Sequence, residues 1–209
     1  MASQNPKEKT RQFGESGKRE SQLDWEEYFM AIAFLSGMRS KDPVTQVGAC
    51  IVNPKKRIVG TGNNGMPNSC SDRLLPLGKK DDASQLGTKR YYVCHAEMNA
   101  VINKFTADLE DCTMYVCLYP CNECAKIIIQ SGIKTVVYYS DKKHDKEEVK
   151  AAKILFEAAR VEIREYNGKK KQVMVDFQSI EDATKDRTKG SRKSLYSFAD
   201  CFPSSAFQN

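Results

Sequence analysis

The stretch HAEMNAVINKFTADLEDCTMYVCLYPCNECAKIIIQS, residues 95–131, decides how this chain folds. Its two ends, HAEMNAVINKF (95–105) and CNECAKIIIQS (121–131), have the pattern of short helices. Between them, TMYVCL (113–118) has the apolar, β-branched and aromatic content of a strand. Gly132 stands where a helix commonly stops. This helix–strand–helix unit predicts helices packed on a sheet.

The segments on both sides continue the alternation of helix and strand. Asp24 and Glu27 have the spacing of a capping box, which opens a helix, and Asp145 with Glu148 repeats that spacing before another helical apolar stripe. Strands are predicted for five further apolar segments: 46–53, 57–62, 134–140, 161–166 and 172–177. The order predicts an α/β fold, a three-layer α/β/α sandwich with a mixed central sheet.

Composition predicts one domain with two tails. The chain has 209 residues, which suits a single domain of ordinary size. Residues 1–22 are polar and predict a flexible basic N-terminal tail, residues 23–177 predict the domain, and residues 178–209 predict a flexible C-terminal tail. The first twenty residues lack an apolar signal segment, and no apolar run approaches the ~20 residues needed to cross a bilayer. We therefore expect a cytoplasmic protein without a membrane partner.

The positive charge of the chain lies mainly in its tails. The formal net charge is +6, but residues 21–167 carry 20 basic and 19 acidic side chains. Proteins that bind nucleic acid usually concentrate basic side chains on one face. The composition therefore does not point to a nucleic-acid partner.

A long segment, residues 63–93, has no clear period and is rich in Gly, Pro, Asn and Ser. Structureless segments of this length in a compact domain are usually functional or disordered. Because it leads directly into His95, we expect it to form a wall or lid of an active site.

Three side chains have the spacing of zinc ligands: His95, Cys121 and Cys124. The two cysteines share one helical face, and both ends of the pattern fall at predicted helix starts, where the helix dipole favours thiolate. Three protein ligands leave a zinc site open for a water molecule, whereas a structural zinc site closes with four. The alternative of a closed structural site lacks an evident fourth ligand in the sequence.

Glu97 is the candidate proton shuttle. It lies two residues after His95, close enough to reach a metal-bound water without binding the metal. Zinc lowers the pKa of such a water to ~7. One carboxylate can then take a proton from the water and return it to a leaving amine, which is general acid–base catalysis.

The combination H-x-E followed by P-C-x-x-C is typical of zinc-dependent base deaminases. Four longer segments resemble the deoxycytidylate (dCMP) deaminase family: DWEEYFMAIAFLSGMRSKDPVTQVGACIV, GNNGMPNSCSD, YVCHAEMNA and PCNECAKIIIQSGI. The resemblance implies a cytidine-deaminase-like fold and hydrolytic deamination of dCMP to dUMP and ammonia by a zinc-bound hydroxide, supplying dUMP for thymidylate synthesis. It also implies a homo-oligomer, typically a hexamer, that is activated by dCTP and inhibited by dTTP with Mg²⁺.

The resemblance also assigns roles to individual residues. His95, Cys121 and Cys124 would bind one catalytic Zn²⁺ per subunit, with Glu97 as the proton shuttle. The residues that would bind substrate are Asn64 at the sugar hydroxyl, Ala49 and Ala96 with their backbone at the base, and Tyr119 at the pocket wall. For Tyr119 the alternative is an ordinary aromatic residue at a strand end. Asn63 and Gly65 would belong to the allosteric region, although the family usually has an aromatic residue where Asn63 stands.

Other functions compete with this one. A polynucleotide deaminase acting on tRNA or DNA uses the same zinc core. A cytidine deaminase for free nucleosides usually has a cysteine in place of His95. A non-catalytic regulatory subunit would be expected to lack Glu97 or a zinc ligand, and this chain retains all four residues.

Overall fold

The computed structural model describes residues 22–71, 73–77 and 85–179. Most of both predicted tails lies outside these residues. The described residues up to Lys169 belong to one compact unit, and those from Lys170 onward belong to a second. Everything that builds the site lies in the first unit.

The first unit contains a five-stranded mixed sheet with the order β2-β1-β3-β4-β5. Strand β1 pairs antiparallel with β2 and β3, whereas β3–β4 and β4–β5 are parallel. The strands are β1 (Gly48–Val52), β2 (Ile58–Asn63), β3 (Thr113–Leu118), β4 (Thr135–Ser140) and β5 (Glu162–Glu165).

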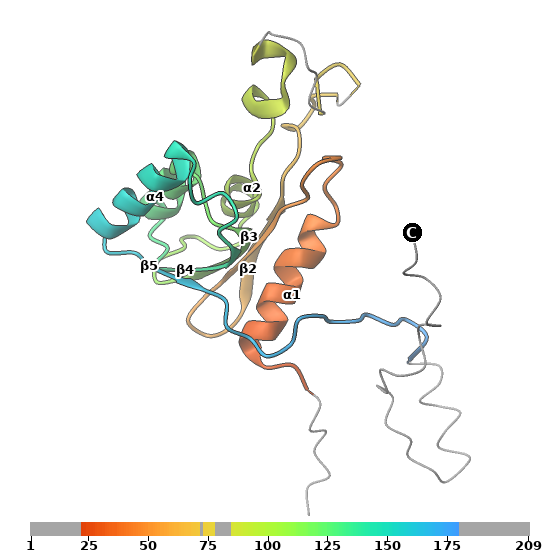
Figure 1. Cartoon of the computed structure of the whole chain (residues 1–209). Coiled ribbons are helices and arrows are strands. Elements are labelled where there is room, and N and C mark those ends of the chain that lie inside the picture. Colours follow the sequence, from red (N-terminus) through yellow and green to blue (C-terminus); the bar gives the residue numbers. More distant parts are fainter. Residues whose placement is uncertain (1–21, 72, 78–84, 180–209) are drawn as a thin grey trace, which may run out of the picture. The chain divides into compact units, whose positions relative to one another are not determined.

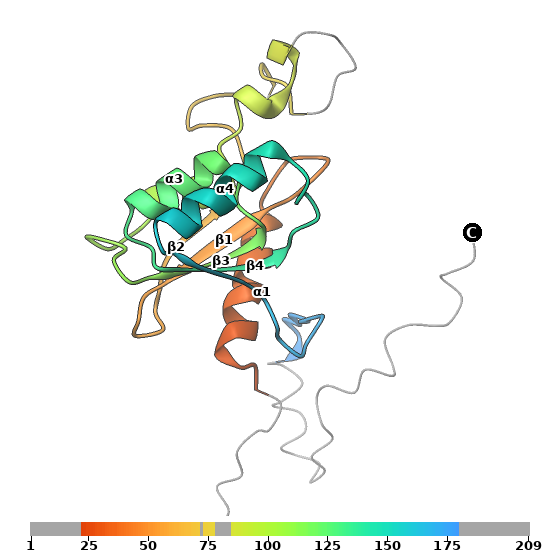
Figure 2. The same ribbon diagram turned by 60° about the vertical axis from the view of Figure 1, so that its left-hand side comes forward.

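Helices cover both faces of this sheet, with α1 on one face and the other three helices on the opposite face (Figures 1 and 2). Within the described ranges the α-helices are α1 (Trp25–Gly37), α2 (Ala96–Ile102), α3 (Asn122–Gln130) and α4 (Glu147–Ala158). The residues of β1 alternate between two hydrophobic clusters, because side chains on a strand point to opposite faces in turn. Ala49 and Ile51 pack with α2, α3 and α4, whereas Cys50 and Val52 pack with Phe29 and other residues of α1. The predicted three-layer α/β/α sandwich is confirmed.

Local signals set the ends of two helices. The Asp24 carboxylate accepts the Glu27 N–H at 2.7 Å, and the Glu27 carboxylate accepts the Asp24 N–H at 3.3 Å, so the predicted capping box opens α1. After α3, Gly132 has φ +79°, and its N–H bonds to the Ile129 carbonyl while the Ile133 N–H bonds to the Ile128 carbonyl. These two bonds form a Schellman motif, which ends the helix that carries Cys124 in its first turn.

Two expectations from the sequence are wrong. The helix α4 begins at Glu147 with Lys146 before it, and no side chain caps it. The helix starts one residue later than a box of Asp145 and Glu148 requires, and Glu148 pairs instead with Arg90 at 2.6 Å. Residues 172–177 form no strand, and all of them are exposed. Without a neighbouring strand or a buried face, an isolated apolar segment does not hold an extended ladder.

The two ends of the segment between β2 and α2 pair with each other. The N–H of Gly65 donates to the Cys94 carbonyl at 3.1 Å, and the N–H of Cys94 donates to the Gly65 carbonyl at 2.9 Å. Short 3₁₀ turns at Gln85–Gly87 and Lys89–Tyr91 lead back to this pair. None of the helices in the described ranges has the length and apolar character that a membrane crossing needs.

Candidate active site

The structure brings His95, Cys121 and Cys124 together, with their ligand atoms within 4.8 Å of one another. His95 immediately precedes α2, Cys121 immediately precedes α3, and Cys124 lies in the first turn of α3. The His95 Nδ1 atom lies 3.3 Å from the Cys124 Sγ and 3.4 Å from the Cys121 Sγ. The N-termini of α2 and α3 therefore lie next to each other at this group.

This group has the dimensions of a zinc site. Zinc bonds of ~2.0–2.1 Å to nitrogen and ~2.3 Å to sulfur, at a tetrahedral angle, separate nitrogen from sulfur by about 3.6 Å. The N···S distances of 3.3 and 3.4 Å lie within a few tenths of an ångström of that value. An imidazole with two thiolates suits Zn²⁺. Among the residues that the structure describes, no fourth His, Cys, Asp or Glu joins the group, so one coordination position stays open.

The two thiols share a hydrogen bond that separates their acidities. The Cys124 thiol lowers the pKa of Cys121 to about 4, with a further contribution from His95, although burial opposes it. The same contact and burial raise the pKa of Cys124. The hydrogen bond to Cys121 also raises the pKa of His95 above its usual range. Cys121 therefore takes the thiolate form readily, which is the form that binds a metal.

Glu97 lies beside the ligands in the first turn of α2, and only 4% of it is exposed. Burial raises the pKa of its carboxyl above the usual value, with a smaller opposing effect from His95. A buried carboxyl beside an open metal site can both accept and donate a proton.

The predicted base-facing residues Ala49 and Ala96 are fully buried. The side chain and the backbone of both residues are enclosed in this structure, and the backbone contact with the base stays a prediction. Strand β2 approaches the start of α2 closely, since a Cβ added to Gly62 would lie 2.3 Å from the Ala96 carbonyl oxygen. This approach places the end of β2 next to the helix that follows His95.

Asn64 and its two neighbours form the end of β2 and the turn after it. Asn64 is 6% exposed, and its side chain bonds to the loop between α1 and β1. The Asn63 carbonyl accepts a bond from the Asn99 side chain at 2.7 Å, and the Asn63 amide donates to the Asn64 carbonyl at 3.2 Å. Gly65 pairs with Cys94, the residue before His95. The predicted sugar-binding and allosteric positions therefore adjoin the metal group.

Tyr119 is packed as a strand-end aromatic residue. It is 9% exposed, and its ring centroid lies 4.8 Å from that of Tyr138 and 6.3 Å from that of Phe156. The Lys153 Nζ atom lies 5.1 Å from the same centroid. These neighbours enclose the ring as they would for an ordinary strand-end aromatic residue, and the contact of Tyr119 with substrate stays a prediction.

Two residues at this site were missed by the sequence reasoning, Asp42 and Lys89. The Asp42 carboxylate is buried, bonds to the Asn64 side chain and forms an ion pair with Lys89. An Asp followed by Pro43 is a signal for a turn in which the carboxylate binds nearby backbone amides. Nothing in the sequence pointed to Lys89, which lies 47 residues away.

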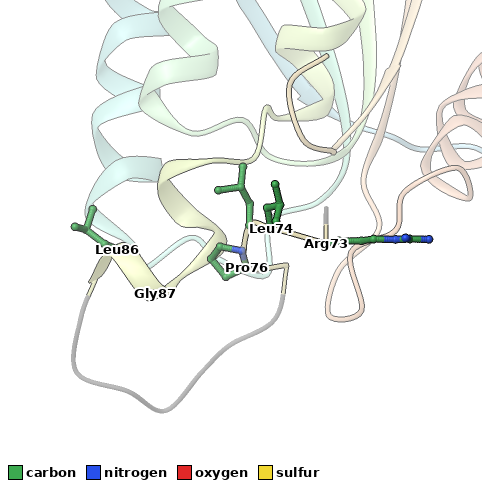
Figure 3. Close-up of a pocket in the computed structure, with 6 residues that line it drawn as sticks. Arg73, Leu74, Pro76, Leu86 and Gly87 are labelled. Carbon is green, nitrogen blue, oxygen red and sulfur yellow. The ribbon is translucent and has the colours of Figure 1, made fainter. Parts of the chain in front are cut away.

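A pocket of about 360 Å³ lies in the segment between β2 and α2, and none of the residues predicted to bind zinc, to transfer protons, or to contact the base, the sugar or an effector lines it (Figure 3). Its lining residues are Arg73, Leu74, Leu75, Pro76, Leu86 and Gly87. The group of His95, Cys121 and Cys124 at the starts of α2 and α3 is therefore not part of this pocket.

An α/β/α sandwich with an open His/Cys/Cys group at two helix starts, and a buried carboxylate two residues after the histidine, defines a zinc-dependent hydrolytic deaminase. The family model for the cytidine and deoxycytidylate deaminase zinc-binding region matches residues 23–140. The chain belongs to the cytidine and deoxycytidylate deaminase family.

Similar proteins agree with this membership. The deoxycytidylate deaminase of Mus musculus is 58% identical over 163 residues, which cover 78% of this chain and 91% of the mouse protein. The deoxycytidylate deaminase of Homo sapiens is 56% identical over 163 residues, with the same coverage of both chains. The crystal structure of dCMP deaminase from the cyanophage S-TIM5 in complex with dCMP and dUMP superposes with a TM-score of 0.54 at 24% identity, covering 68% of this chain and 96% of that chain. At that identity the superposition supports the fold alone.

Proposed function

We propose that this chain catalyses the hydrolytic deamination of dCMP to dUMP and ammonia, which supplies dUMP for thymidylate synthesis. One observation carries the proposal: an open three-ligand group lies beside a buried carboxylate in a chain that is 56–58% identical to mammalian deoxycytidylate deaminases over 91% of their length. The reaction consumes one water and exchanges the amine on the ring for an oxygen.

The Nδ1 atom of His95 and the Sγ atoms of Cys121 and Cys124 would hold one Zn²⁺ per subunit. When bound, zinc acts as a Lewis acid that makes a water molecule acidic enough to react near neutral pH. The two helix starts add positive potential at this point, which favours the thiolate ligands. His95 must be neutral at Nδ1 to bind.

Glu97 would move the protons. Its carboxylate accepts a proton from the attacking water and delivers it to the ring nitrogen next to the amine-bearing carbon. It then carries the second proton of the water to the departing amine, which leaves as ammonia. Burial supports this role, because a carboxyl with a raised pKa gives up and regains a proton more evenly at neutral pH.

Substrate binding would use the surrounding backbone and Asn64. The backbone N–H of Ala96 lies in the first turn of α2, where helix amides lack partners within the helix. Ala49, in the neighbouring strand, would face the base with its own backbone. Asn64 would contact the sugar hydroxyl, and Tyr119 would support the pocket from within the core.

Regulation and assembly belong to the same proposal. Effector nucleotides, dCTP and dTTP with Mg²⁺, would act through Asn63 and Gly65, which flank Asn64 directly. The enzyme would be a cytoplasmic homohexamer with a catalytic domain over residues 23–177 and flexible tails at 1–22 and 178–209. The resemblance to the dCMP deaminases supports these assignments.

The test is ammonia release by the purified zinc-loaded protein with dCMP and deoxycytidine side by side. Turnover of dCMP alone, abolished by Glu97→Ala, is the expected result. Activity on deoxycytidine alone would contradict the nucleotide assignment and leave the zinc chemistry in place. Activity only on single-stranded DNA or tRNA would favour the polynucleotide alternative.

A further inference from the structure

The side chain of Asn64 makes three hydrogen bonds inside the protein. Its Oδ1 accepts the Val47 N–H at 2.9 Å. Its Nδ2 donates to the Thr45 carbonyl at 3.0 Å and to the Asp42 Oδ2 at 3.2 Å. Both donor hydrogens of the amide are therefore used by the loop between α1 and β1.

These partners permit only one orientation of the amide. Two acceptors, the Thr45 carbonyl and the Asp42 carboxylate, surround one end, and one donor, the Val47 N–H, faces the other. A flipped amide would set its oxygen against two acceptors and its NH₂ against a donor, so every bond would be lost. The hydrogen-bond network thus defines which end of Asn64 is oxygen.

Asp42 is the centre of this arrangement. Its Oδ1 accepts the backbone N–H groups of Val44 and Thr45 at 2.8 and 3.2 Å, and its Oδ2 accepts from Asn64 and from the Lys89 ammonium. Only 4% of Asp42 is exposed. A carboxylate buried to this extent is stable when it is paired and fully hydrogen-bonded.

Lys89 reaches Asp42 from the segment that leads to His95, six residues further along the chain. The ion pair therefore joins the loop before β1 to the segment between β2 and α2. Without the ammonium, the buried carboxylate would lose the cation that the structure pairs with it. The Asp42 Oδ2 atom, which accepts from the Asn64 amide, would then lose the contact that fixes its position.

These hydrogen bonds determine whether Asn64 can donate to a sugar hydroxyl or only accept from it. With both Nδ2 hydrogens in use, the remaining capacity of the side chain is the second lone pair on Oδ1, which can only accept. We propose that Asp42 and Lys89 are positioning residues that hold the Asn64 amide so that its Oδ1 accepts a hydrogen bond from the 3′-hydroxyl of the bound deoxynucleotide. The inference rests on the proposed function, because it requires a deoxynucleotide in this site.

The experiment measures binding separately from turnover. Dissociation constants are measured by calorimetry on zinc-loaded Glu97→Gln protein for dCMP, 2′,3′-dideoxycytidine monophosphate and the 3′-deoxy-3′-fluoro analogue. Loss of one neutral hydrogen bond is expected to weaken binding about fivefold. Because fluorine cannot donate, the fluoro analogue should bind as weakly as the dideoxynucleotide.

Adding Lys89→Met should lower the dCMP-to-dideoxynucleotide ratio to below about twofold, since the hydroxyl loses its oriented acceptor. Lys89→Arg should restore the ratio, because it keeps the charge. Lys150→Met is the matched control, since Lys150 forms an exposed ion pair with Glu147 at 2.8 Å. That control should leave the ratio at about fivefold. Thermal unfolding and zinc content are measured on each variant, because a merely structural role for Lys89 would weaken both nucleotides equally.

Two outcomes would overturn the inference: an unchanged ratio in Lys89→Met, or a fluoro analogue that binds as tightly as dCMP. The proposed function has its own readout in the turnover of dCMP by the protein with Glu97 intact. If the ratio of dCMP to dideoxynucleotide binding responds to Lys89→Met as expected but dCMP is not turned over, the proposed function is contradicted and the positioning role of Lys89 stands. Absence of dCMP binding would overturn both.

Discussion

Gly65 and Cys94 pair through both of their backbone groups, with N···O distances of 3.1 and 2.9 Å. The pairing is antiparallel, so Asn64, before Gly65, lies opposite His95, after Cys94. A single bridge therefore brings the predicted sugar contact and a predicted zinc ligand together. Glu97, Cys121 and Cys124 lie close to His95 because α2 and α3 both begin on the same face of the sheet.

Replacing Glu97 with Gln should abolish turnover and leave the metal in place. The amide cannot accept and return the proton, and loss of a general acid–base typically costs ~10²–10⁴-fold in rate. Zinc should stay bound because Glu97 does not belong to the group formed by His95, Cys121 and Cys124. The measurement is kcat for dCMP together with zinc per subunit. Zinc loss in this variant would show that the carboxylate is a ligand rather than a proton shuttle.

Much of this site could be predicted because its signals are local. The H-x-E and P-C-x-x-C spacings lie within single helix starts, and the stop at Gly132 depends on the φ of one residue. The ion pair between Asp42 and Lys89 joins two loops 47 residues apart, and no periodicity connects them. The box expected at Asp145 and Glu148 also failed, since α4 begins one residue too late for it and Glu148 bonds to Arg90 from a distant segment. Local chemistry is readable from sequence, whereas pairing between loops requires the fold.

Removing zinc should abolish turnover and lower the melting temperature without unfolding the chain. Most residues of the two hydrophobic clusters, one on each face of the sheet, do not bind the metal, whereas the starts of α2 and α3 would lose their common anchor. A ligand that binds only the folded state stabilises it by mass action. Calorimetry with and without a chelator, followed by zinc readdition, measures the effect. Complete loss of helical signal in the chelated protein would contradict this expectation. Cys124→Ala should reproduce the chelated state and resist rescue by zinc.

Gly62→Ala should destabilise the protein and weaken zinc binding together. A Cβ at this position would lie 2.3 Å from both the Ala96 oxygen and the Ala100 nitrogen, so β2 and α2 must move apart. Overpacking of this kind costs about 1–3 kcal/mol. Denaturant unfolding and zinc affinity are the measurements. Gly87→Ala is the matched control, because a Cβ there meets nothing within 4 Å. Equal stability of the two variants would contradict the close approach of β2 to α2.

Acid should remove the stabilisation that Asp42 provides. Burial alone would raise the pKa of its carboxyl, but the Lys89 ammonium and the amides of Val44 and Thr45 hold that pKa below its ordinary value. A carboxyl with a depressed folded-state pKa stabilises the protein above the unfolded-state pKa of about 3.9, and this stability is lost as the pH falls below it. The free energy of unfolding of the zinc-free protein should therefore exceed that of Asp42→Asn at pH 7, and the difference should shrink below about pH 4. Zinc-free protein is used because the metal ligands also take up protons in acid. A difference that stays constant from pH 7 to pH 3 would show that Asp42 acts through its shape rather than through its charge.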